Sequence, residues 1–217
     1  MAGRGDSGTV EPIQNPLCHV LRMGYWQRMD PPVNFDRDSA GVSLAESFAD
    51  DLANHTQQYI GLIPCAYGGT SIRRWMPDEI LFEHAVFMGK LAQKSSTLGG
   101  IIWHQGENNC ANFDKAFYRS KFTEMIAALR KELGAKELPL IIGEISEDIT
   151  EKWGCGDNPP KFNALLRELA EELPHCAVAS SKGLTLRPDG IHFDAPSCRE
   201  LGHRYFEKYM ELTEGNK

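Results

Sequence analysis

Two side chains near the end of this 217-residue sequence could form an acid–base pair for nucleophilic catalysis. Asp189 and His192 stand three residues apart in the segment Leu-Arg-Pro-Asp-Gly-Ile-His-Phe-Asp, residues 186–194. A histidine that deprotonates a weak nucleophile needs a carboxylate on its other ring nitrogen, which fixes the tautomer and supports the imidazolium ion. Asp-x-x-His in a loop can bring the two groups together. A surface loop with a solvated histidine is the alternative interpretation.

A second polar segment directly follows an apolar run, in Ile-Ile-Trp-His-Gln-Gly-Glu-Asn-Asn, residues 101–109. Gln105 could donate a hydrogen bond to a developing oxyanion, as amide side chains do in acyl transfer. Glu107 could hold a positioning contact. His104 and Glu107 have no third ligand of matching character nearby, so the segment does not predict a metal site. Five polar residues in this position favour a functional site over a core position.

A third segment is rich in small residues and reads Cys-Ala-Tyr-Gly-Gly-Thr-Ser-Ile-Arg-Arg-Trp, residues 65–75. Its two glycines, Gly68 and Gly69, allow a tight turn or a close approach of the backbone to a ligand. Thr70 offers a hydroxyl group and Trp75 offers a stacking face. A plain turn followed by a helix cap is the alternative interpretation and, for this stretch alone, the favoured one.

The elements that must position these segments alternate along the chain. Apolar runs predict strands at Cys18–Arg22 and at residues 59–66, 100–103, 138–145 and 177–180. Amphipathic patterns predict helices over residues 44–53, 80–91, 113–133, 160–173 and 196–212. Such alternation is typical of one α/β domain with a parallel sheet, here of about five strands. Ligands bind beyond the carboxyl ends of such strands, so the three polar segments are expected to meet there.

The composition excludes several classes of function. The formal net charge of −7 and the lack of a basic stripe argue against a nucleic-acid partner. No run approaches the roughly 18 apolar residues of a membrane span. The first residues do not form an apolar leader, which predicts a cytoplasmic protein. The six cysteines are scattered without a Cys-x-x-Cys pair, so neither a zinc site nor a disulfide framework is predicted.

Three segments in their order along the chain resemble the carbohydrate acetylesterase group of SGNH hydrolases, which includes acetylxylan esterases and sialate O-acetylesterase-like domains. They are Gly-Leu-Ile-Pro-Cys-Ala-Tyr-Gly-Gly-Thr-Ser-Ile-Arg-Arg-Trp at 61–75, Ile-Ile-Trp-His-Gln-Gly-Glu at 101–107 and Ser-Lys-Gly-Leu-Thr-Leu-Arg-Pro-Asp-Gly-Ile-His-Phe at 181–193. Residues 40–49 also look like that family's Gly-x-Gly-Pro-x-x-x-Phe-Ala segment. The resemblance implies a flavodoxin-like three-layer α/β/α sandwich over one domain, residues 1–217. It also implies a serine esterase that acts on an acetylated carbohydrate without a metal or cofactor.

The resemblance also implies a role for each matching residue. His192 would be the general base and Asp189 would orient it. Gln105 and backbone N–H groups near Gly41 and Ser43 would stabilise the oxyanion, although Ser43 stands where the family has a glycine. Further substrate contacts would come from Gly69, Thr70 and Glu107.

The family's nucleophilic serine lies in a segment of the form Gly-Gln-Ser-Asn-Met-Ala-Gly-Arg-Gly. This chain starts at that methionine, with Met-Ala-Gly-Arg-Gly as residues 1–5, so the serine and its strand are expected before residue 1. In a flavodoxin-like order that strand would be interior, between Cys18–Arg22 and residues 59–66. Ser7 follows Gly5-Asp6 as in other SGNH enzymes, but residues 1–4 cannot form the buried strand that such a serine needs.

Two alternatives remain open at this level. The chain could be a sugar-binding remnant that uses Trp75, Trp103 and residues 68–71 as a platform. It could also be a structural or interaction protein, but that function gives Asp189, His192 and Gln105 no reason to converge.

Overall fold

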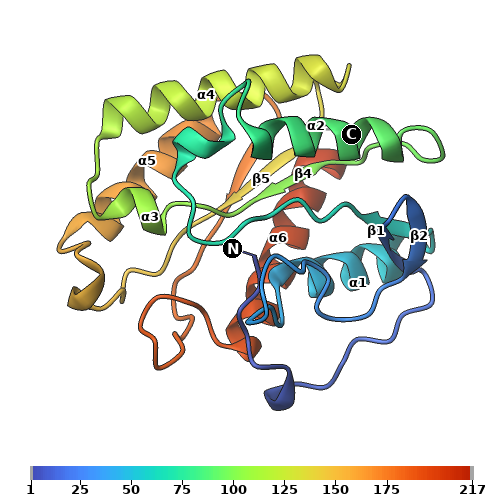
Figure 1. Cartoon of the computed structure of the whole chain (residues 1–217), viewed down its shortest axis with the longest axis horizontal. Coiled ribbons are helices and arrows are strands. Elements are labelled where there is room, and N and C mark those ends of the chain that lie inside the picture. The colour runs from blue at the N-terminus through green and yellow to red at the C-terminus, as the bar shows by residue number, and fades with distance from the viewer. Residues whose placement is uncertain (1, 216–217) are drawn as a thin grey trace.

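The computed structural model describes residues 2–215, which form three layers. Helices α2 (Ile80–Ala92), α4 (Lys115–Glu132) and α5 (Asn158–Glu172) lie on one side of the strands. Helices α1 (Leu44–Thr56) and α6 (Ala195–Glu214) lie on the other side (Figure 1). The five helices correspond to the five that the sequence predicts, and the α/β fold class is confirmed.

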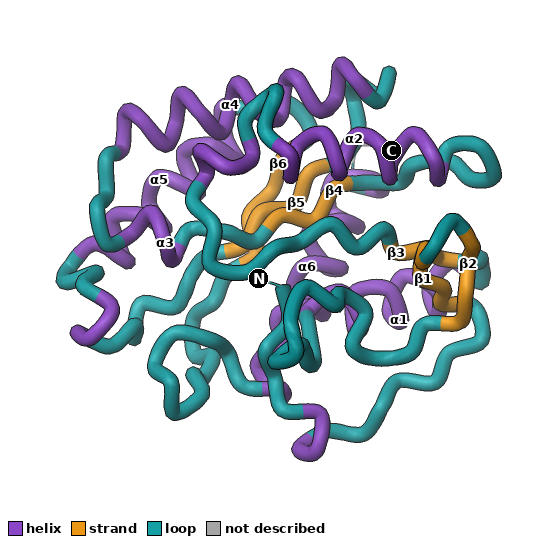
Figure 2. Tube along the Cα trace, viewed as in Figure 1, coloured by secondary structure: helices purple, strands orange, loops and turns teal. Residues whose placement is uncertain are grey.

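The strands form two sheets of three, with the orders β2-β1-β3 and β4-β5-β6 (Figure 2). The described strands are β1 (Cys18–Arg22), β2 (Tyr25–Arg28), β3 (Ile60–Leu62), β4 (Ile101–Trp103), β5 (Leu140–Gly143) and β6 (Cys176–Ala179). All pairs are parallel except the β1–β2 hairpin. The predicted parallel strands are present, but they are divided between two sheets. The exposed strand β2 was not predicted because its side chains carry no buried stripe.

The expected neighbours of the interior strand also need correction. Strands β1 and β3 do not flank a third strand but pair directly, with Cys18 opposite Ile60 and Val20 opposite Leu62. The reason is local, because two parallel strands joined by one crossover helix, here α1, usually lie side by side. Within residues 2–215, the edge of β3 that faces away from β1 has no partner strand.

Apolar side chains fill the space on both faces of β5, whose Leu140, Ile141 and Ile142 are fully buried. Leu140 and Ile142 pack in the cluster with α4 and α5, whereas Ile141 packs in the cluster with α6. In β4 the corresponding Ile101 and Ile102 are only partly buried. Strand β4 is bonded to β5 on one edge, and its other edge has no partner strand among residues 2–215.

A cavity of about 1610 Å³ separates the two sheets, and its lining includes all of β3 and all of β4. We call the part between these strands the inter-sheet slot. Helices cover it on both sides, with Phe48 of α1 on one side and Phe82 of α2 and Met125 of α4 on the other. The slot therefore lies where a sheet with two helical layers would have a central strand.

The short helices that follow the strands shape the polar end of the fold. The segments after β3, β4 and β5 contain η2 (Ile72–Trp75), α3 (Glu107–Cys110) and η3 (Glu151–Trp153), respectively. A further short helix, η1 (Ser7–Thr9), lies near the start of the chain. Two of the three predicted polar segments therefore lie, with η3, beyond the carboxyl ends of the parallel strands.

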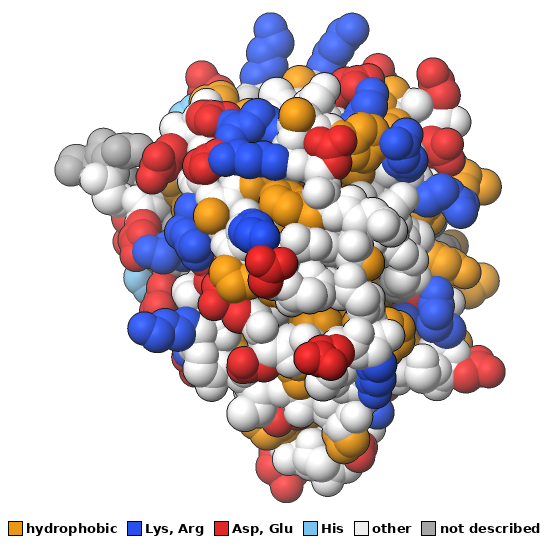
Figure 3. Space-filling view, turned by 90° about the vertical axis from the view of Figure 1, so that its left-hand side faces the viewer, with side chains coloured by type: hydrophobic (Ala, Val, Ile, Leu, Met, Phe, Trp, Pro, Cys, Tyr) orange, Lys and Arg blue, Asp and Glu red, His pale blue; other side chains and the backbone are white. Residues whose placement is uncertain are grey.

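The surface agrees with the charge pattern of the sequence. On the face shown in Figure 3, Lys and Arg side chains are interspersed with Asp and Glu, and no basic stripe forms there. Within residues 2–215, no helix has the length and apolar character needed to cross a membrane.

Candidate active site

The loop after β6 holds Asp189 and His192 in contact. A turn at Gly190, whose φ of 70° is in the left-handed region, folds the loop back so that Arg187 N–H donates to the His192 carbonyl at 2.7 Å. The Nδ1 atom of His192 then lies 3.0 Å from Oδ2 of Asp189. Oδ1 of Asp189 accepts the backbone N–H groups of Ile191 at 3.1 Å and of His192 at 3.0 Å. The predicted contact between the two side chains is present.

The environment of Asp189 keeps its carboxylate ionised. Burial alone would raise the pKa of Asp189, but the hydrogen bonds from the backbone and ring of His192 and from Ile191 outweigh burial and lower the pKa. An ionised carboxylate accepts the Nδ1–H of the neutral imidazole, which leaves Nε2 as the acceptor. This is the tautomer that a general base requires.

Gln105 lies at the end of β4, but its amide group is fully engaged. Nε2 donates to the Thr70 carbonyl at 3.0 Å and to Oδ1 of Asn109 at 2.9 Å, and Oε1 accepts the Tyr118 hydroxyl at 3.0 Å. An amide nitrogen has two hydrogens, so both are used in this structure. Gln105 here fastens the glycine-rich loop to β4, and donation to an oxyanion stays a prediction that requires one of these bonds to be exchanged.

The glycine-rich loop at residues 68–70 is held by a buried ion pair. The Asp36 carboxylate accepts one hydrogen bond from each terminal nitrogen of the Arg4 guanidinium, at 2.6 and 2.9 Å, and one from the backbone N–H of Gly68 at 2.9 Å. The Arg4 and Asp36 side chains are 6% and 2% exposed. A Cβ atom at Gly68 would lie 2.5 Å from the Arg4 guanidinium, so a larger residue there would displace one member of this ion pair.

The other two members of this loop also line the cavity. Gly69 has a φ of 75° and its carbonyl accepts from Asn108 at 3.2 Å. The Thr70 hydroxyl donates to the Tyr67 carbonyl at 2.8 Å and accepts the Trp75 indole N–H at 3.0 Å. Gly69 and Thr70 thus reach the site as predicted, and their contact with substrate stays a prediction.

The backbone at Gly41 and Ser43 pairs with the start of the chain. Gly41 N–H donates to the Gly3 carbonyl at 3.2 Å, and Gly5 and Val42 exchange two hydrogen bonds. Ser43 N–H donates to Oε1 of Glu46 at 3.2 Å in a capping box that begins α1. The N–H groups of Gly41 and Ser43 therefore have acceptors already, and their role in an oxyanion hole stays a prediction.

Glu107 is the first residue of α3 and lies against a buried histidine. Its Oε1 is 3.5 Å from Nε2 of His104, whose Nδ1 is 3.2 Å from the Tyr205 hydroxyl. Burial lowers the pKa of His104. Burial alone would raise the pKa of Glu107, but the hydrogen bond and charge of His104 outweigh it and lower the pKa to about 2. Glu107 therefore positions His104, and within residues 2–215 no three metal-ligating side chains gather into a site.

A fourth segment, which sequence reasoning missed, is η3 in the loop after β5. Trp153 donates its indole N–H to the Asp189 carbonyl at 2.9 Å, and Thr150 N–H donates to the Gly190 carbonyl at 3.0 Å. Trp153 is 42% exposed and lines the cavity together with His192. The signal in the sequence is a tryptophan in a polar stretch, Glu-Lys-Trp-Gly, without an apolar run around it.

The tryptophans that the sequence suggested as a sugar platform line the cavity, but their rings are buried. Trp75 and Trp103 are 7% and 9% exposed and pack edge to face, with ring centroids 5.2 Å apart. Both belong to the apolar cluster under α2 and α4. The proposed platform of Trp75 and Trp103 is therefore wrong, because hydrophobic packing buries both rings.

Ser7 is exposed on η1 and does not line the cavity. Within residues 2–215, no serine hydroxyl is hydrogen-bonded to the His192 ring. The Asp189–His192 pair is thus in place.

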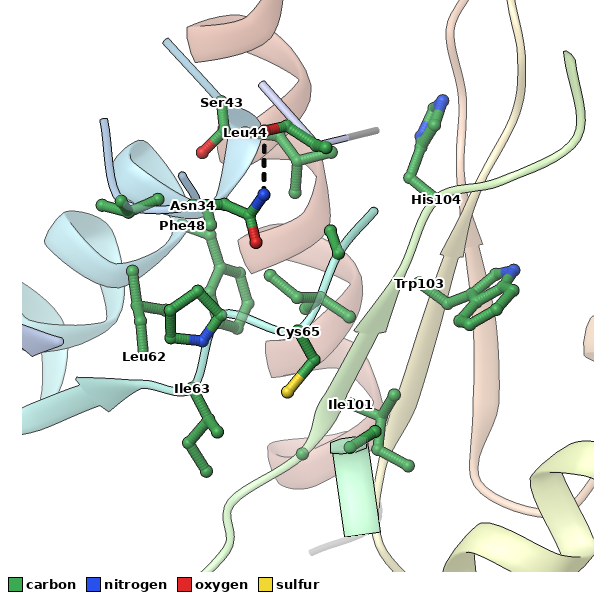
Figure 4. Close-up of a pocket in the computed structure, with 18 of the residues that line it drawn as sticks. Asn34, Ser43, Leu44, Phe48, Leu62, Ile63, Cys65, Ile101, Trp103 and His104 are labelled. Carbon is green, nitrogen blue, oxygen red and sulfur yellow. Dashed lines mark hydrogen bonds between the residues drawn. The ribbon is translucent and has the colours of Figure 1, made fainter. Parts of the chain in front are cut away.

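The inter-sheet slot and the polar end of the fold belong to one cavity. Figure 4 shows Leu62, Ile63 and Cys65 on one side and Ile101 and Trp103 of β4 on the other. The lining continues to Ala2, Asp189 and His192. Space between the sheets therefore leads to the general-base pair.

Comparison with known proteins gives one consistent result. The profile of the family described as carbohydrate esterase, sialic acid-specific acetylesterase, matches residues 1–211. A probable carbohydrate esterase from Arabidopsis thaliana is 28% identical over 209 residues, which are 90% of this chain and 76% of the relative.

Solved structures agree in fold. An Arabidopsis thaliana protein has a TM-score of 0.81 at 25% identity, covering 93% of this chain and 82% of its own. A carbohydrate acetylesterase from Xanthomonas citri has a TM-score of 0.63 at 22% identity, over 91% of this chain and 49% of its own. A carbohydrate acetylesterase family member from Sinorhizobium meliloti has a TM-score of 0.55 at 17% identity, over 91% of this chain and 97% of its own.

Proposed function

Because the chain belongs to the sialic acid-specific acetylesterase family of carbohydrate esterases, we propose that it hydrolyses O-acetyl esters on a sugar by serine-type acyl transfer. The observation that carries this proposal is the 3.0 Å contact between Nδ1 of His192 and Oδ2 of Asp189, beside a cavity. A base of this kind activates a hydroxyl nucleophile, and the mechanism needs no metal or cofactor.

The reaction has two halves, each with one proton transfer through His192. Nε2 of His192 takes the proton of the serine hydroxyl while the serine oxygen attacks the acetyl carbonyl carbon. The tetrahedral intermediate breaks its bond to the sugar oxygen, which receives the same proton from Nε2. Water then repeats the sequence on the acetyl-serine and releases acetate. Asp189 stays ionised throughout and supports each imidazolium ion.

Oxyanion stabilisation is assigned to Gln105 and to the backbone N–H groups of Gly41 and Ser43. Each of these donors is bonded to another protein atom, at 2.9–3.2 Å. Donation to the oxyanion therefore requires a small shift of residues 3–5 or of the glycine-rich loop. One preorganised donor typically lowers the barrier by about 3–4 kcal/mol.

We place the nucleophilic serine at the end of a β-strand that occupies the inter-sheet slot. The free edges of β3 and β4 both face this space, and each offers the backbone N–H and C=O groups that a parallel strand needs. Neighbouring strands lie about 4.8 Å apart, so one strand with bonds on both sides would join the two sheets.

The lining of the slot suits a strand rather than a sugar. Side chains from α1 on one side and from α2 and α4 on the other make both faces apolar, as around a central parallel strand. A sugar has hydroxyl groups that such a lining would leave without partners. Ala2 lines the cavity, so a segment joined to the start of residues 1–217 can enter the slot directly and end beside His192.

The experiment adds a short apolar strand that ends in Gly-Gln-Ser-Asn to the start of residues 1–217. We expect this extended protein to release acetate from O-acetylated methyl xylopyranoside. Matched controls change the added serine to alanine or carry His192→Gln, and each should abolish release. Acetate release that survives both changes would refute the serine mechanism.

A further inference from the structure

Trp153 is an exposed aromatic ring whose orientation is fixed by the general-base loop. Its indole N–H donates to the Asp189 carbonyl at 2.9 Å, so the single polar atom of the side chain is satisfied. The ring is nevertheless 42% exposed and lines the cavity with His192. The ring has therefore already lost its rotamer entropy. A ligand that stacks on this exposed face would not have to pay that entropy again on binding.

The backbone below the ring is fixed on both sides. Before it, the N–H and hydroxyl groups of Thr150 both donate to the Gly190 carbonyl, at 3.0 and 3.3 Å. After it, Gly154 ends η3 in the left-handed region, with a φ of 71°. The next residue, Cys155, is buried. The position of the ring relative to His192 is therefore set by the fold and not by a free loop.

The two faces of the ring differ in their surroundings. The Lys152 ammonium lies over the ring, 5.9 Å from its centroid, as in a weak cation–π contact. Lys152 can cover only one face, and the other is the candidate ligand surface. Among the tryptophans, Trp75 and Trp103 are buried in the core, and Trp26 belongs to β2 and donates its indole N–H to Ser95.

We propose that Trp153 is the surface on which the pyranose ring of the substrate stacks, so that the ester it carries is held beside His192. This inference rests on the proposed function and adds a specificity determinant to it. A pyranose presents C–H groups on its faces and hydroxyl groups at its rim. An indole face therefore selects a cyclic sugar over an open-chain polyol that carries the same acetyl ester.

The first test observes binding and does not depend on turnover. The extended protein, with its added serine changed to alanine, is labelled with 5-fluorotryptophan, and its four tryptophan signals are followed by fluorine NMR, with Trp153→Phe to assign one of them. We expect O-acetylated methyl xylopyranoside to shift the Trp153 signal and to leave those of Trp75 and Trp103 in place. Glycerol monoacetate, which lacks the ring, should shift the Trp153 signal much less.

The second test separates the aromatic face from the hydrogen bond to Asp189. Trp153→Phe and Trp153→Leu both lose the N–H donor, but only the first keeps a ring. We expect Trp153→Phe to bind the pyranoside within about threefold of the natural protein and Trp153→Leu to bind about tenfold more weakly. Phe87→Leu is the matched control, because Phe87 is an exposed ring on α2 outside the cavity lining.

The outcomes separate this inference from the esterase proposal. Equal weakening in the two Trp153 variants would assign the residue to support of Asp189 and overturn stacking. Saturation transfer to the pyranoside with a stationary Trp153 signal, or no binding at all, would also overturn it. Neither result bears on acetate release by the extended protein, which tests the esterase proposal separately.

Discussion

Both oxygens of the Asp189 carboxylate contact His192. Oδ2 lies 3.0 Å from Nδ1 of the ring, and Oδ1 lies 3.0 Å from the backbone nitrogen. The carboxylate thus fixes the ring and the backbone of the base together. In Asp189→Asn, the amide NH₂ group can donate to Nδ1. The His192 ring then carries its proton on Nε2, which is the wrong tautomer for a general base.

We therefore expect Asp189→Asn to lower kcat for an aryl acetate by about 10⁴-fold in the extended, serine-bearing protein. Asp194→Asn is the matched control. Asp194 caps α6 by accepting Ser197 N–H at 2.8 Å, and asparagine keeps this acceptor, so Asp194→Asn should change kcat little. Equal losses of kcat in the two variants would contradict the assignment of Asp189.

The second prediction concerns stability and pH at Asp36. Burial alone would raise the pKa of Asp36, but the hydrogen bonds from Arg4 and Gly68 outweigh it and lower the pKa. A carboxyl group with a lower pKa in the folded state stabilises the fold fully above its unfolded pKa. That contribution is lost as the pH falls from about 4 through the folded pKa.

In the extended protein, Asp36→Asn should therefore lower the free energy of unfolding at pH 7 by about 3–5 kcal/mol, because Arg4 is left buried without its partner. The difference from the natural protein should shrink as the pH approaches 3, which denaturant unfolding at several pH values would measure. Asp157→Asn, in an exposed pair with Lys161, should change little at any pH. A difference for Asp36→Asn that does not vary with pH would contradict the linkage.

The positions of most elements follow from the sequence, and the reasons are local. Runs such as residues 138–145 predict β5 because a strand buried on both faces needs continuous apolar side chains. The Asp189–His192 contact was predictable because a three-residue spacing around Gly190 lets a tight turn close on itself.

The features that could not be predicted from the sequence are the strand pairing and the burial of individual tryptophans, because both depend on packing between distant segments. The pairing of β1 with β3, and hence the place of the inter-sheet slot, is a tertiary outcome that no periodicity encodes. The burial of Trp103 against residues of α2 and α4, and the exposure of Trp153, are likewise tertiary outcomes. Residue type alone therefore suggested the wrong tryptophans.

The third prediction separates two roles for Gln105. If Gln105 acts by fastening the glycine-rich loop, Asn109→Ala should reduce kcat almost as much as Gln105→Ala, because Asn109 Oδ1 accepts from both Gln105 and the Ile72 backbone. If Gln105 donates to the oxyanion, Gln105→Ala should lower kcat by about 10²–10³-fold and Asn109→Ala by much less. From the proposed mechanism we expect the second pattern, and kcat values for the extended protein decide between them.

The fourth prediction concerns Ser7. Because Ser7 is exposed on η1 and outside the cavity lining, it cannot be deprotonated by His192. Residues 1–217 alone should show little or no hydrolysis of aryl acetates, and Ser7→Ala should leave any residual rate unchanged. A rate that disappears in Ser7→Ala would show that this serine, after a rearrangement of η1, is the nucleophile.

The last prediction concerns the inter-sheet slot and the cooperativity of folding. Strands β3 and β4 have free edges inside the fold, and Ile101 and Ile102 lack the full cover that β5 has. Each buried backbone group without a partner costs about 1–3 kcal/mol, whereas a typical domain is stable by only about 5–15 kcal/mol.

We therefore expect residues 1–217 alone to be insoluble or to melt over a broad range, with water entering between the two sheets. The protein extended by a strand should melt sharply as a monomer. An extension of the same length with a central proline is the matched control, because proline lacks the N–H that a strand donates to its neighbour. This control should melt less sharply than the protein with the unbroken strand. Thermal melting of the three proteins, followed by circular dichroism, makes the comparison. A sharp cooperative transition for the unextended monomer would mean that the two sheets are stable without a strand between them, and the assignment of the slot would be wrong.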